Sequence, residues 1–539
     1  MSDAITPDSP RPKVGLDPIC LLPHAIAHWA AETPDNPAVT YVDGPTMTYA
    51  DLDRHVRRWA AAYRRIGIGP RDHVATMIPN GFTVYGAWVG LGWLKAIEVP
   101  LNGALVGPML RYMLDNSDST TLVMSAQYVE RLHPIAHELP TLQRLIVVDG
   151  EADTDGLPFE VITEAELLAD VEPADDLEGP LYRDIACILY TSGTTGPSKG
   201  VLTTWATIYQ MWSWVPPDAI LPGEAAHMSL PMFHNSGKSG ITSVISRGGH
   251  YVMRDRFSAT SFWEEVRRYD CKIASVVGPM LALINSAPRR DDDADNPLRS
   301  VVCGPMIPEV EDFKERFGVK VGTCYGMTET GAPVATTWDH GPWAGCGRLR
   351  EDYPWTRVRL VDDNDEPVAI GEIGEMIVNT EEPWALNAGY YNMPEKTAEA
   401  WRNGWFHTGD AFRQDEDGWY YFVDRMKDTI RRRGENISSF EVEAIIGEFP
   451  PVSEVAAYAV PDGLGGDEVM VAIIPMQGET VDPAELAEWL QPRMPKYMIP
   501  RYVDIVEEFP RNETTMRVKK HELRAAGITA SAWDREAAG

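Results

Sequence analysis

The segment Tyr190–Val201, which reads Y-T-S-G-T-T-G-P-S-K-G-V, carries the most evident chemical groups of the chain. It follows an apolar stretch, Ala186–Leu189, that is typical of a buried strand. Its glycines, small hydroxyl groups and single ammonium group are what a loop needs in order to wrap a polyphosphate. We therefore predict a phosphate-binding loop formed by Thr191, Ser192, Gly193, Thr194, Thr195, Gly196 and Lys199.

Two other interpretations of this loop stay open at the level of the sequence. A cluster of Gly, Ser and Thr is also typical of a solvated surface turn. In addition, Gly196–Gly200 satisfies G-x-S-x-G, the nucleophile elbow of serine hydrolases, with Ser198 as the nucleophile. An elbow requires a tight strand-to-helix turn. Ser198 comes several residues after the apolar stretch and directly after a proline, which disfavours a hydrolase.

The loop resembles the phosphate-binding loop of the adenylate-forming enzymes, the superfamily of acyl-CoA synthetases, firefly luciferase and peptide-synthetase adenylation domains. Further motifs of that superfamily follow in the same order, and the resemblance extends from about residue 24 to about residue 524. These motifs are Cys303–Met306, which departs from a Gly-Gly-Ala-Pro-like turn, Tyr325–Thr330, Trp405–Asp410 and Asp424–Asp428. The chain is most similar to the acyl-CoA synthetase branch.

This resemblance implies a reaction in two steps. The carboxylate of a small-molecule acid attacks the α-phosphate of ATP, which gives acyl-AMP and pyrophosphate, and the thiol of CoA then displaces AMP. Mg²⁺ is the implied cofactor and Glu329 its implied ligand, because proteins hold Mg²⁺ through few carboxylates plus substrate phosphates. The resemblance also implies nucleotide contacts at Gly304, Pro305, Tyr325, Gly326, Asp410 and Arg425, and a catalytic role for Thr328 beside Glu329.

The same resemblance assigns residues to the acid, to a hinge and to CoA. The motif around His234 matches the gate of the acyl pocket, so His234, also a catalytic candidate, is expected there with Asn235 and Gly237. Lys427 occupies the hinge about which a C-terminal domain rotates between the two steps. Because arginines bind phosphates and glycine suits a narrow passage, we expect the CoA tunnel at Arg431, Arg432, Arg433 and Gly434. A solvated charged loop is the alternative for these arginines.

One motif departs from the superfamily at a position that matters for catalysis. The superfamily carries a P-x-T-x-T-G-K-[IV]-x-K pattern near its C-terminus, and the first lysine contacts the carboxylate and the α-phosphate during adenylation. The corresponding stretch here is Pro510–Leu523, and aligning Thr515, Val518 and Lys520 places Arg517 in that lysine position. Arginine presents a wide planar fork where lysine presents a compact ammonium group, which puts the adenylation step in doubt.

Three functions therefore stay open besides a hydrolase. The first is a complete acyl-CoA ligase in which Arg517, Lys519 or Lys520 supports adenylation. The second is an enzyme that transfers the acyl group from preformed acyl-AMP to CoA, with a separate adenylating enzyme as partner. The third is a non-catalytic acyl-adenylate binding protein, which the retained motif residues disfavour.

Short β-branched runs that alternate with helical patterns must position these groups. The candidate strands are His73–Met77, Thr121–Met124, Leu145–Val148, Ile188–Ser192, Ala274–Val277, Ser300–Cys303 and Lys320–Cys324. This alternation predicts α/β layers with largely parallel sheets. From about residue 355 the strands read as antiparallel, with a hairpin turn at Asp415–Gly418. We expect a large N-terminal AMP-binding domain of residues 1–426 with an antiparallel β subdomain, and a small mobile α+β domain of residues 427–539.

The net charge and the cysteines limit which classes of binding partner and which cellular compartment we expect for the protein. The 539 residues contain 48 Lys and Arg against 80 Asp and Glu, a net charge of −32, which disfavours nucleic acid and membrane surfaces as partners. The N-terminus has no apolar core of a secretory signal, and the longest uncharged stretch, Val74–Leu94, is interrupted by Pro79. Six scattered cysteines without a C-x-x-C pair predict reduced thiols in the cytoplasm. A homo-oligomer stays open.

Overall fold

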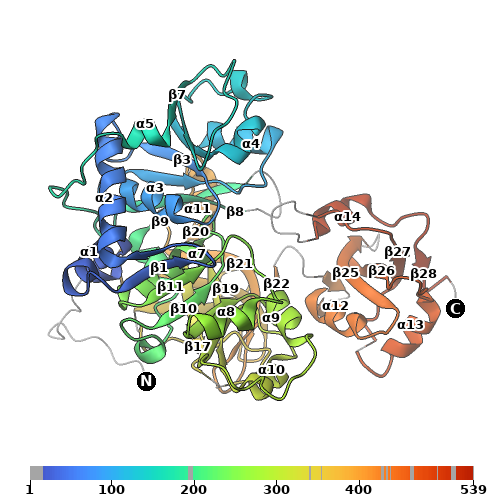
Figure 1. Ribbon diagram of the computed structural model, residues 1–539. Helices are drawn as coiled ribbons and strands as arrows, with labels where there is room; N and C mark the ends of the chain where they lie inside the picture. The colour runs from blue at the N-terminus through green and yellow to red at the C-terminus, as the bar shows by residue number, and fades with distance from the viewer. Residues whose placement is uncertain are drawn as a thin grey trace, which may run out of the picture. The chain divides into compact units, whose positions relative to one another are not determined.

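The computed structural model describes residues 16–191, 198–338, 341–353, 355–425, 430–432, 435–437, 439–461, 467–494, 496–511 and 518–537. The chain divides into two compact units (Figure 1). The N-terminal unit comprises the chain up to Thr191, Ser198–Arg357 and Val378–Gly404, and the C-terminal unit comprises Val358–Ile377 and the chain from Trp405 onward. The predicted boundary at residues 426 and 427 lies outside the described residues, and the strands just before it group with the C-terminal unit.

The first sheet of the N-terminal unit has seven strands in the order β7-β6-β5-β3-β4-β8-β9. All neighbouring pairs are parallel except β8 and β9, which are antiparallel. The strands are β3 (His73–Met77), β4 (Ile97–Pro100), β5 (Thr121–Ser125), β6 (Arg144–Val148), β7 (Glu160–Thr163), β8 (Ile185–Thr191) and β9 (Lys199–Thr204). The predicted strands His73–Met77, Thr121–Met124 and Leu145–Val148 are confirmed. The predicted strand Ile188–Ser192 corresponds to β8, which begins three residues earlier, and Ser192 lies outside the described residues. The strands β4, β7 and β9 were not predicted.

The second sheet also has seven strands, in the order β14-β13-β12-β10-β11-β1-β2, and only β2 is antiparallel to its neighbour. The strands are β1 (Pro37–Tyr41), β2 (Thr46–Thr48), β10 (Ala225–Met228), β11 (His250–Met253), β12 (Cys271–Val276), β13 (Ser300–Cys303) and β14 (Lys320–Gly322). The predicted strand Lys320–Cys324 is corrected here: it ends at Gly322, and a separate strand, β15 (Cys324–Met327), begins two residues later.

Helices cover these sheets and bury the largest core of the unit between them (Figure 1). They are α1 (Leu22–Glu32), α2 (Tyr49–Arg65), α3 (Phe82–Trp93), α4 (Gly107–Asn116), α5 (Glu164–Leu168), α6 (Trp205–Gln210), α7 (Asn235–Ser246), α8 (Phe262–Arg268), α9 (Gly278–Asn285), α10 (Val310–Phe317) and α11 (Pro394–Ala400). Thr48 and Asp51 form a reciprocal capping box at the start of α2, which satisfies two helix-end groups.

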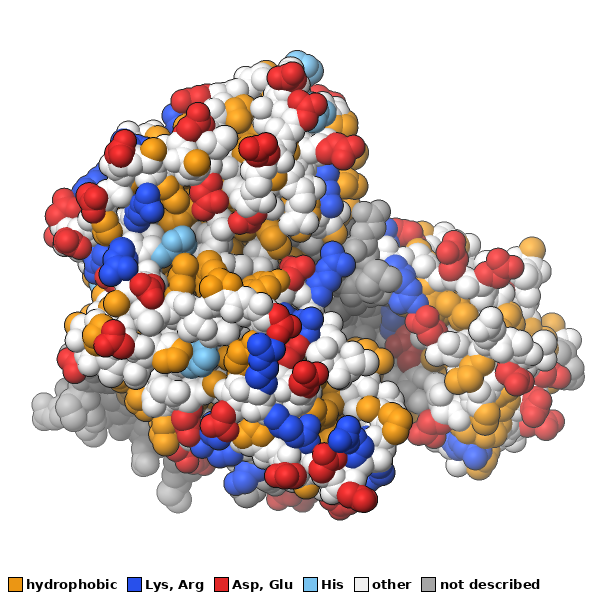
Figure 2. Space-filling view, viewed as in Figure 1, with side chains coloured by type: hydrophobic (Ala, Val, Ile, Leu, Met, Phe, Trp, Pro, Cys, Tyr) orange, Lys and Arg blue, Asp and Glu red, His pale blue; other side chains and the backbone are white. Residues whose placement is uncertain are grey.

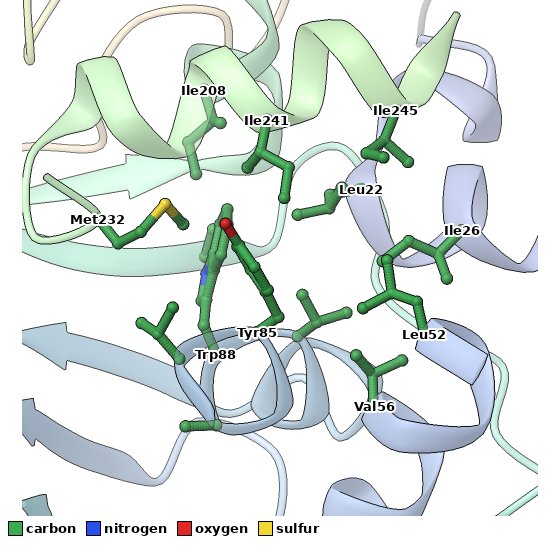
Figure 3. Close-up of a cluster of buried hydrophobic side chains, with 14 of the residues drawn as sticks. Leu22, Ile26, Leu52, Val56, Tyr85, Trp88, Ile208, Met232, Ile241 and Ile245 are labelled. Atoms are coloured by element: carbon green, nitrogen blue, oxygen red, sulfur yellow. The ribbon is translucent and has the colours of Figure 1, made fainter. Parts of the chain in front are cut away.

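Figure 3 shows the centre of this core, where residues of α1, α2, α3, α6 and α7 meet. Trp88 of α3 stacks on Trp205 of α6, with ring centroids 5.6 Å apart and an interplanar angle of 11°. Leu52 and Val56 of α2 are fully buried in the same cluster, because a helical spacing of four places both on one face. Trp212 and Trp214 are buried in the same core, although α6 ends before them, at Gln210.

Antiparallel strands make up the remaining sheets. β15 pairs with β16 (Gly331–Ala335), which pairs with β17 (Arg348–Leu349). A five-stranded sheet contains β18 (Thr356–Val361), β19 (Ile373–Thr380), β20 (Trp401–Arg402), β21 (Trp405–Gln414) and β22 (Tyr420–Arg425). The predicted hairpin at Asp415–Gly418 joins β21 to β22, which are antiparallel. The α/β class with an antiparallel portion is thus confirmed.

The rest of the C-terminal unit is a small α+β structure. Its four-stranded sheet has the order β25-β26-β27-β28, formed by Val452–Pro461, Asp467–Pro475, Tyr502–Ile505 and Trp533–Asp534. Beside it are a two-stranded ribbon of β23 (Ile430–Arg432) and β24 (Glu435–Ile437) and the helices α12 (Ser439–Gly447), α13 (Pro483–Leu490) and α14 (Lys520–Ala526).

Three further features of the structure concern its charged side chains, its cysteines and its helices. Acidic and basic side chains alternate over the face drawn in Figure 2, without a continuous basic patch on that face. All six cysteines are free thiols. In the described part of the chain, no helix is both long enough and apolar enough to cross a membrane.

Candidate functional site

The predicted phosphate loop connects two antiparallel strands, β8 and β9. Thr191, the last residue of β8, is paired with Lys199, the first residue of β9. The five predicted loop residues between them, Ser192, Gly193, Thr194, Thr195 and Gly196, lie outside the described residues. A strand, and not a helix, follows Ser198. Ser198 therefore does not lie at the strand-to-helix turn that a nucleophile elbow requires, and the structure disfavours a serine hydrolase.

Lys199 and Glu329, which are far apart in the sequence, meet at one aromatic ring. The Lys199 ammonium nitrogen lies 4.7 Å from the ring centroid of Tyr390. The hydroxyl of the same tyrosine donates a hydrogen bond to Oε1 of Glu329 over 3.1 Å. Glu329 is buried, with 5% of its surface exposed, and Tyr390 is buried at 7%. The structure thus brings a predicted phosphate-loop residue and the predicted magnesium ligand to the same place.

The main chain of Glu329 is fixed by a second residue of the same segment. Both the backbone N–H and the side-chain amide of Asn387 donate to the carbonyl oxygen of Glu329, over 2.9 and 3.0 Å. Asn387 and Tyr390 were not among the predicted site residues. The polar and aromatic run N-A-G-Y-Y-N that contains them was the available signal, but their partners are remote in the chain.

The remaining motif residues of the N-terminal unit lie at the ends of strands. Tyr325 and Gly326 belong to β15, and Thr328 follows in the turn to β16. A Cβ atom at Gly326 would lie 2.7 Å from the carbonyl oxygen of Gly331, so only glycine allows this close approach. The turn of Gly304 and Pro305 directly follows β13, on the same edge at which the parallel strand β14 ends. This edge, at the carboxyl ends of parallel strands, is where open α/β sheets bind ligands.

The predicted acyl-pocket residues begin helix α7. His234 is the N-cap residue, and its ring contacts Phe233 with centroids 4.6 Å apart. A Cβ atom at Gly237 would lie 2.2 Å from the carbonyl oxygen of Pro231, which makes glycine obligatory in this first turn. Asn235 is 5% exposed, and both ends of its side-chain amide are buried without a hydrogen-bond partner. Such an amide is costly in the ligand-free protein.

One turn further along α7 lies a fully buried ion pair. The Lys238 ammonium bonds Oε2 of Glu98 on β4 and lies 3.8 Å from the ring centroid of Trp88. Thr76 donates to the other oxygen of Glu98 over 2.8 Å. Burial raises the pKa of Glu98, and the nearby Lys238 opposes that rise. Because its groups are mutually paired, this cluster anchors α7 to the first sheet.

In the C-terminal unit, two predicted nucleotide residues are brought together by strand pairing. Asp410 on β21 lies directly opposite Arg425 on β22 in the antiparallel ladder. The motif that contains Asp410 is held by Glu375, which accepts from His407 Nδ1 over 2.9 Å and from the backbone N–H of Gly409 over 2.9 Å. Asp410 itself is 1% exposed.

The predicted CoA cluster is only partly described. Arg432 is buried, pairs with Glu468 over 2.7 Å and donates to the carbonyl oxygen of Tyr497 over 2.8 Å. These contacts tie it to its own unit, so it does not present its guanidinium group as the prediction required. Lys427, Arg433 and Gly434, and the side chain of Arg431, lie outside the described part of the structure.

The two lysines beside the altered motif are also ion-paired. Lys520, at the start of α14, lies 2.8 Å from Oε1 of Glu443 and donates to the hydroxyl of Ser439. Lys519 pairs with Glu522 over 2.8 Å. Arg517 lies outside the described residues. Both lysines that could replace the superfamily lysine therefore have carboxylate partners.

The single carboxylate of Glu329 suits Mg²⁺ better than it suits a metal ion that needs several protein ligands. Among the described residues, no group of three or more His, Cys, Asp or Glu side chains could hold an ion by itself. Glu329 provides one buried carboxylate, close to the residues expected to hold phosphates. A single carboxylate together with substrate phosphates is the usual environment of Mg²⁺.

Comparison with known proteins places the chain in a family. The model of the AMP-binding enzymes matches residues 26–391, and the model of the AMP-binding enzyme C-terminal domain matches residues 441–515. The crotonobetaine/carnitine–CoA ligase of Salmonella heidelberg (strain SL476) is 32% identical over 490 residues, which cover 88% of this chain and 92% of that protein. The chain belongs to the AMP-binding enzymes, in their acyl-CoA synthetase branch.

Solved structures agree with this assignment. The anthranilate CoA ligase AuaEII in complex with anthranoyl-AMP superimposes with a TM-score of 0.81 at 21% identity, over 95% of this chain and 98% of that one. The o-succinylbenzoate CoA synthetase of Bacillus subtilis in complex with ATP and a magnesium ion gives a TM-score of 0.78 at 25% identity, over 93% and 98% of the two chains. The protein is thus an enzyme with the fold of AMP-forming acyl-CoA ligases.

Proposed function

We propose that the enzyme converts a small-molecule carboxylic acid, ATP and CoA into an acyl-CoA, AMP and pyrophosphate. The observation that supports this proposal is the meeting of Lys199 and Glu329 at Tyr390, since an ammonium group is suited to binding phosphate and a carboxylate is suited to binding Mg²⁺. The likeness to ligases over nearly the whole chain supports the same reaction.

In the first step, a carboxylate oxygen of the acid forms a bond to the α-phosphorus of ATP. The bond from that phosphorus to the bridging oxygen breaks, and pyrophosphate leaves with the electron pair. Lys199 attracts the phosphates, and the Thr328 hydroxyl donates to the reacting oxygens. Glu329 would hold Mg²⁺ together with the phosphates, and the ion, when bound, neutralises part of their charge.

In the second step, the CoA sulfur bonds to the acyl carbon, and the bond from that carbon to the AMP oxygen breaks. AMP leaves with the electron pair, and the thiol proton passes to solvent. We propose that the C-terminal domain turns about Lys427 between the steps, and that Arg431, Arg433 and Gly434 receive CoA. Arg432 is omitted because its side chain is buried against Glu468.

For the acid, we propose a compound with a polar group near its carboxylate. His234, Asn235 and Gly237 would surround it, and the buried Asn235 amide would find its missing partner there. The relative named above acts on crotonobetaine and carnitine, which carry charged groups, but an identity of 32% leaves the acid open.

A second candidate function is favoured by the ion pairs of Lys519 and Lys520. With both lysines paired, adenylation would depend on Arg517, whose charge is spread over a planar fork. The enzyme would then mainly accept acyl-AMP made by a separate adenylating enzyme and transfer the acyl group to CoA.

The experiment that separates the two candidates measures each half-reaction alone. Pyrophosphate release is followed with ATP, Mg²⁺ and a panel of acids that contains crotonobetaine, carnitine, anthranilate and o-succinylbenzoate. AMP release is followed from the matching synthetic acyl-AMPs and CoA. The complete ligase predicts turnover in both assays. Turnover in the second assay alone, with partial recovery of the first in Arg517→Lys, would establish the transfer enzyme, and turnover in neither assay would refute both.

A further inference from the structure

Residues 387–391 form a segment that is bonded to both halves of the nucleotide site in the N-terminal unit. Toward the phosphate loop, the segment follows β9: Leu202 N–H donates to the carbonyl oxygen of Gly389 over 2.9 Å, and Tyr391 N–H donates to that of Gly200 over 2.8 Å. Lys199 directly precedes Gly200 in the same strand. The segment is therefore hydrogen-bonded to the strand that carries the loop lysine.

Toward the Glu329 motif, the same segment supplies three hydrogen bonds. Two come from Asn387 to the carbonyl oxygen of Glu329, and the third comes from the Tyr390 hydroxyl to its carboxylate. The position of Tyr390 is itself fixed, because its backbone N–H donates to the hydroxyl of Thr397 over 2.9 Å. Tyr390 is thus a buried side chain whose hydroxyl contacts one site residue, Glu329, and whose ring contacts another, Lys199.

We propose that Tyr390 is a positioning residue with two separable roles, an inference that rests on the proposed function of Lys199 and Glu329. Its hydroxyl binds Oε1 of Glu329 and so orients the carboxylate toward Mg²⁺. Its ring lies under the Lys199 ammonium and so places that charge beside the phosphates of ATP.

The chemistry of the two contacts explains why one tyrosine serves both. A hydrogen bond to one carboxylate oxygen fixes the plane of the group and leaves the second oxygen directed elsewhere, as outer-shell partners of metal ligands commonly do. The face of an aromatic ring attracts an ammonium group through its quadrupole without adding a countercharge. A carboxylate in the place of the ring would hold the lysine but would also repel phosphates.

The test uses binding of ATP, so it does not require knowledge of the acid. The ATP affinity of the full-length enzyme is measured by calorimetry with Mg²⁺ and again with EDTA, and the ratio of the two gives the gain from the metal. Tyr390→Phe removes the hydroxyl and keeps the ring, whereas Tyr390→Leu removes both. Tyr391→Phe is the matched control. It also removes one tyrosine hydroxyl of the same segment, but the Tyr391 hydroxyl donates to Asp118, over 2.9 Å.

We expect Tyr390→Phe to reduce the gain from Mg²⁺ by about tenfold, the usual effect of losing an outer-shell partner, and to leave ATP affinity in EDTA within twofold. Tyr390→Leu should in addition weaken ATP binding in EDTA, on the order of fivefold, through loss of the cation–π contact. Thermal melting of each variant shows whether it is folded, and if Tyr390→Leu does not fold, Lys199→Met supplies the comparison in EDTA.

A background of Glu329→Gln separates positioning from a general structural effect. If the hydroxyl acts through Glu329, adding Tyr390→Phe to Glu329→Gln changes the gain from Mg²⁺ no further. A Tyr390→Phe variant that behaves like Tyr391→Phe, while Glu329→Gln loses the gain, would overturn the role of Tyr390 alone. A Glu329→Gln variant with the full gain would overturn both this inference and the proposed role of Glu329.

Discussion

The two compact units hold their cationic site residues in different ways. In the N-terminal unit, Lys199 lies over the ring of Tyr390. In the C-terminal unit, Lys520 pairs with Glu443 and Arg432 with Glu468. An aromatic face places a cation without neutralising it, whereas a carboxylate both places and neutralises it. In this protein an aromatic contact thus positions the Lys199 ammonium, whereas Lys520 and Arg432 form ion pairs with carboxylates of their own unit and so help to stabilise that unit.

The largest effect is expected at Glu329. Glu329→Gln should lower ATP-dependent pyrophosphate release by about a thousandfold, because a charge interaction of about 4 kcal/mol at intermediate dielectric corresponds to that factor. AMP release from synthetic acyl-AMP and CoA should fall far less, since no pyrophosphate is transferred there. Equal losses in both assays would contradict the separation of the half-reactions.

Acidification should destabilise the N-terminal unit through two partly buried histidines. Burial lowers the pKa of His55 and of His250 to about 4, below the ordinary value near 6.5. Between these values the unfolded chain binds more protons, so the free energy of unfolding falls as the pH drops from about 6.5 to about 4, by on the order of 2 to 3 kcal/mol for each histidine.

Denaturant unfolding of the wild type and of His250→Asn, at pH 7 and at pH 5, checks this expectation. The variant should lose less stability between the two pH values than the wild type does. An equal loss in both proteins would show that His250 has no part in the pH dependence.

Lys520 offers the sharpest test within the C-terminal unit. Lys520→Met should destabilise the protein by roughly 1 to 2 kcal/mol, because it leaves the partly buried Glu443 without this partner, and should leave pyrophosphate release within about threefold. Lys519→Ala removes an exposed pair and should cost less than about 0.5 kcal/mol. A hundredfold loss of pyrophosphate release in Lys520→Met, with unchanged stability, would instead identify Lys520 as the adenylation lysine.

The smallest expected effect has the opposite sign. Asn235→Leu should stabilise the ligand-free protein by about 1 kcal/mol, because it replaces a buried unpartnered amide by an apolar group of similar shape. In the acid panel it should shift preference toward less polar acids and leave ATP affinity unchanged. Destabilisation by Asn235→Leu would show that the amide is satisfied in the folded protein and does not wait for a ligand.

The sequence alone determined the family resemblance, the order of the motifs and several of the strands and helices. These are local properties: a β-branched run such as His73–Met77 predicts a strand, and Thr48 with Asp51 predicts a helix start, because the relevant interactions involve neighbours in the chain. The break at Thr323 was missed because Thr323 and Thr336 bond each other across a hairpin that no local pattern reveals.

Only the tertiary structure decided which side chains share a site and which are instead paired with other residues of the protein. Tyr390 contacts both Lys199 and Glu329, which lie in segments remote from each other in the sequence. Because no local pattern reveals such contacts, Tyr390 could not be predicted from the sequence. Conversely, Arg432 is of a residue type that often binds phosphate, yet folding buries it against Glu468. Residue type sets what a side chain is able to do, but its availability depends on the partners that long-range packing brings to it.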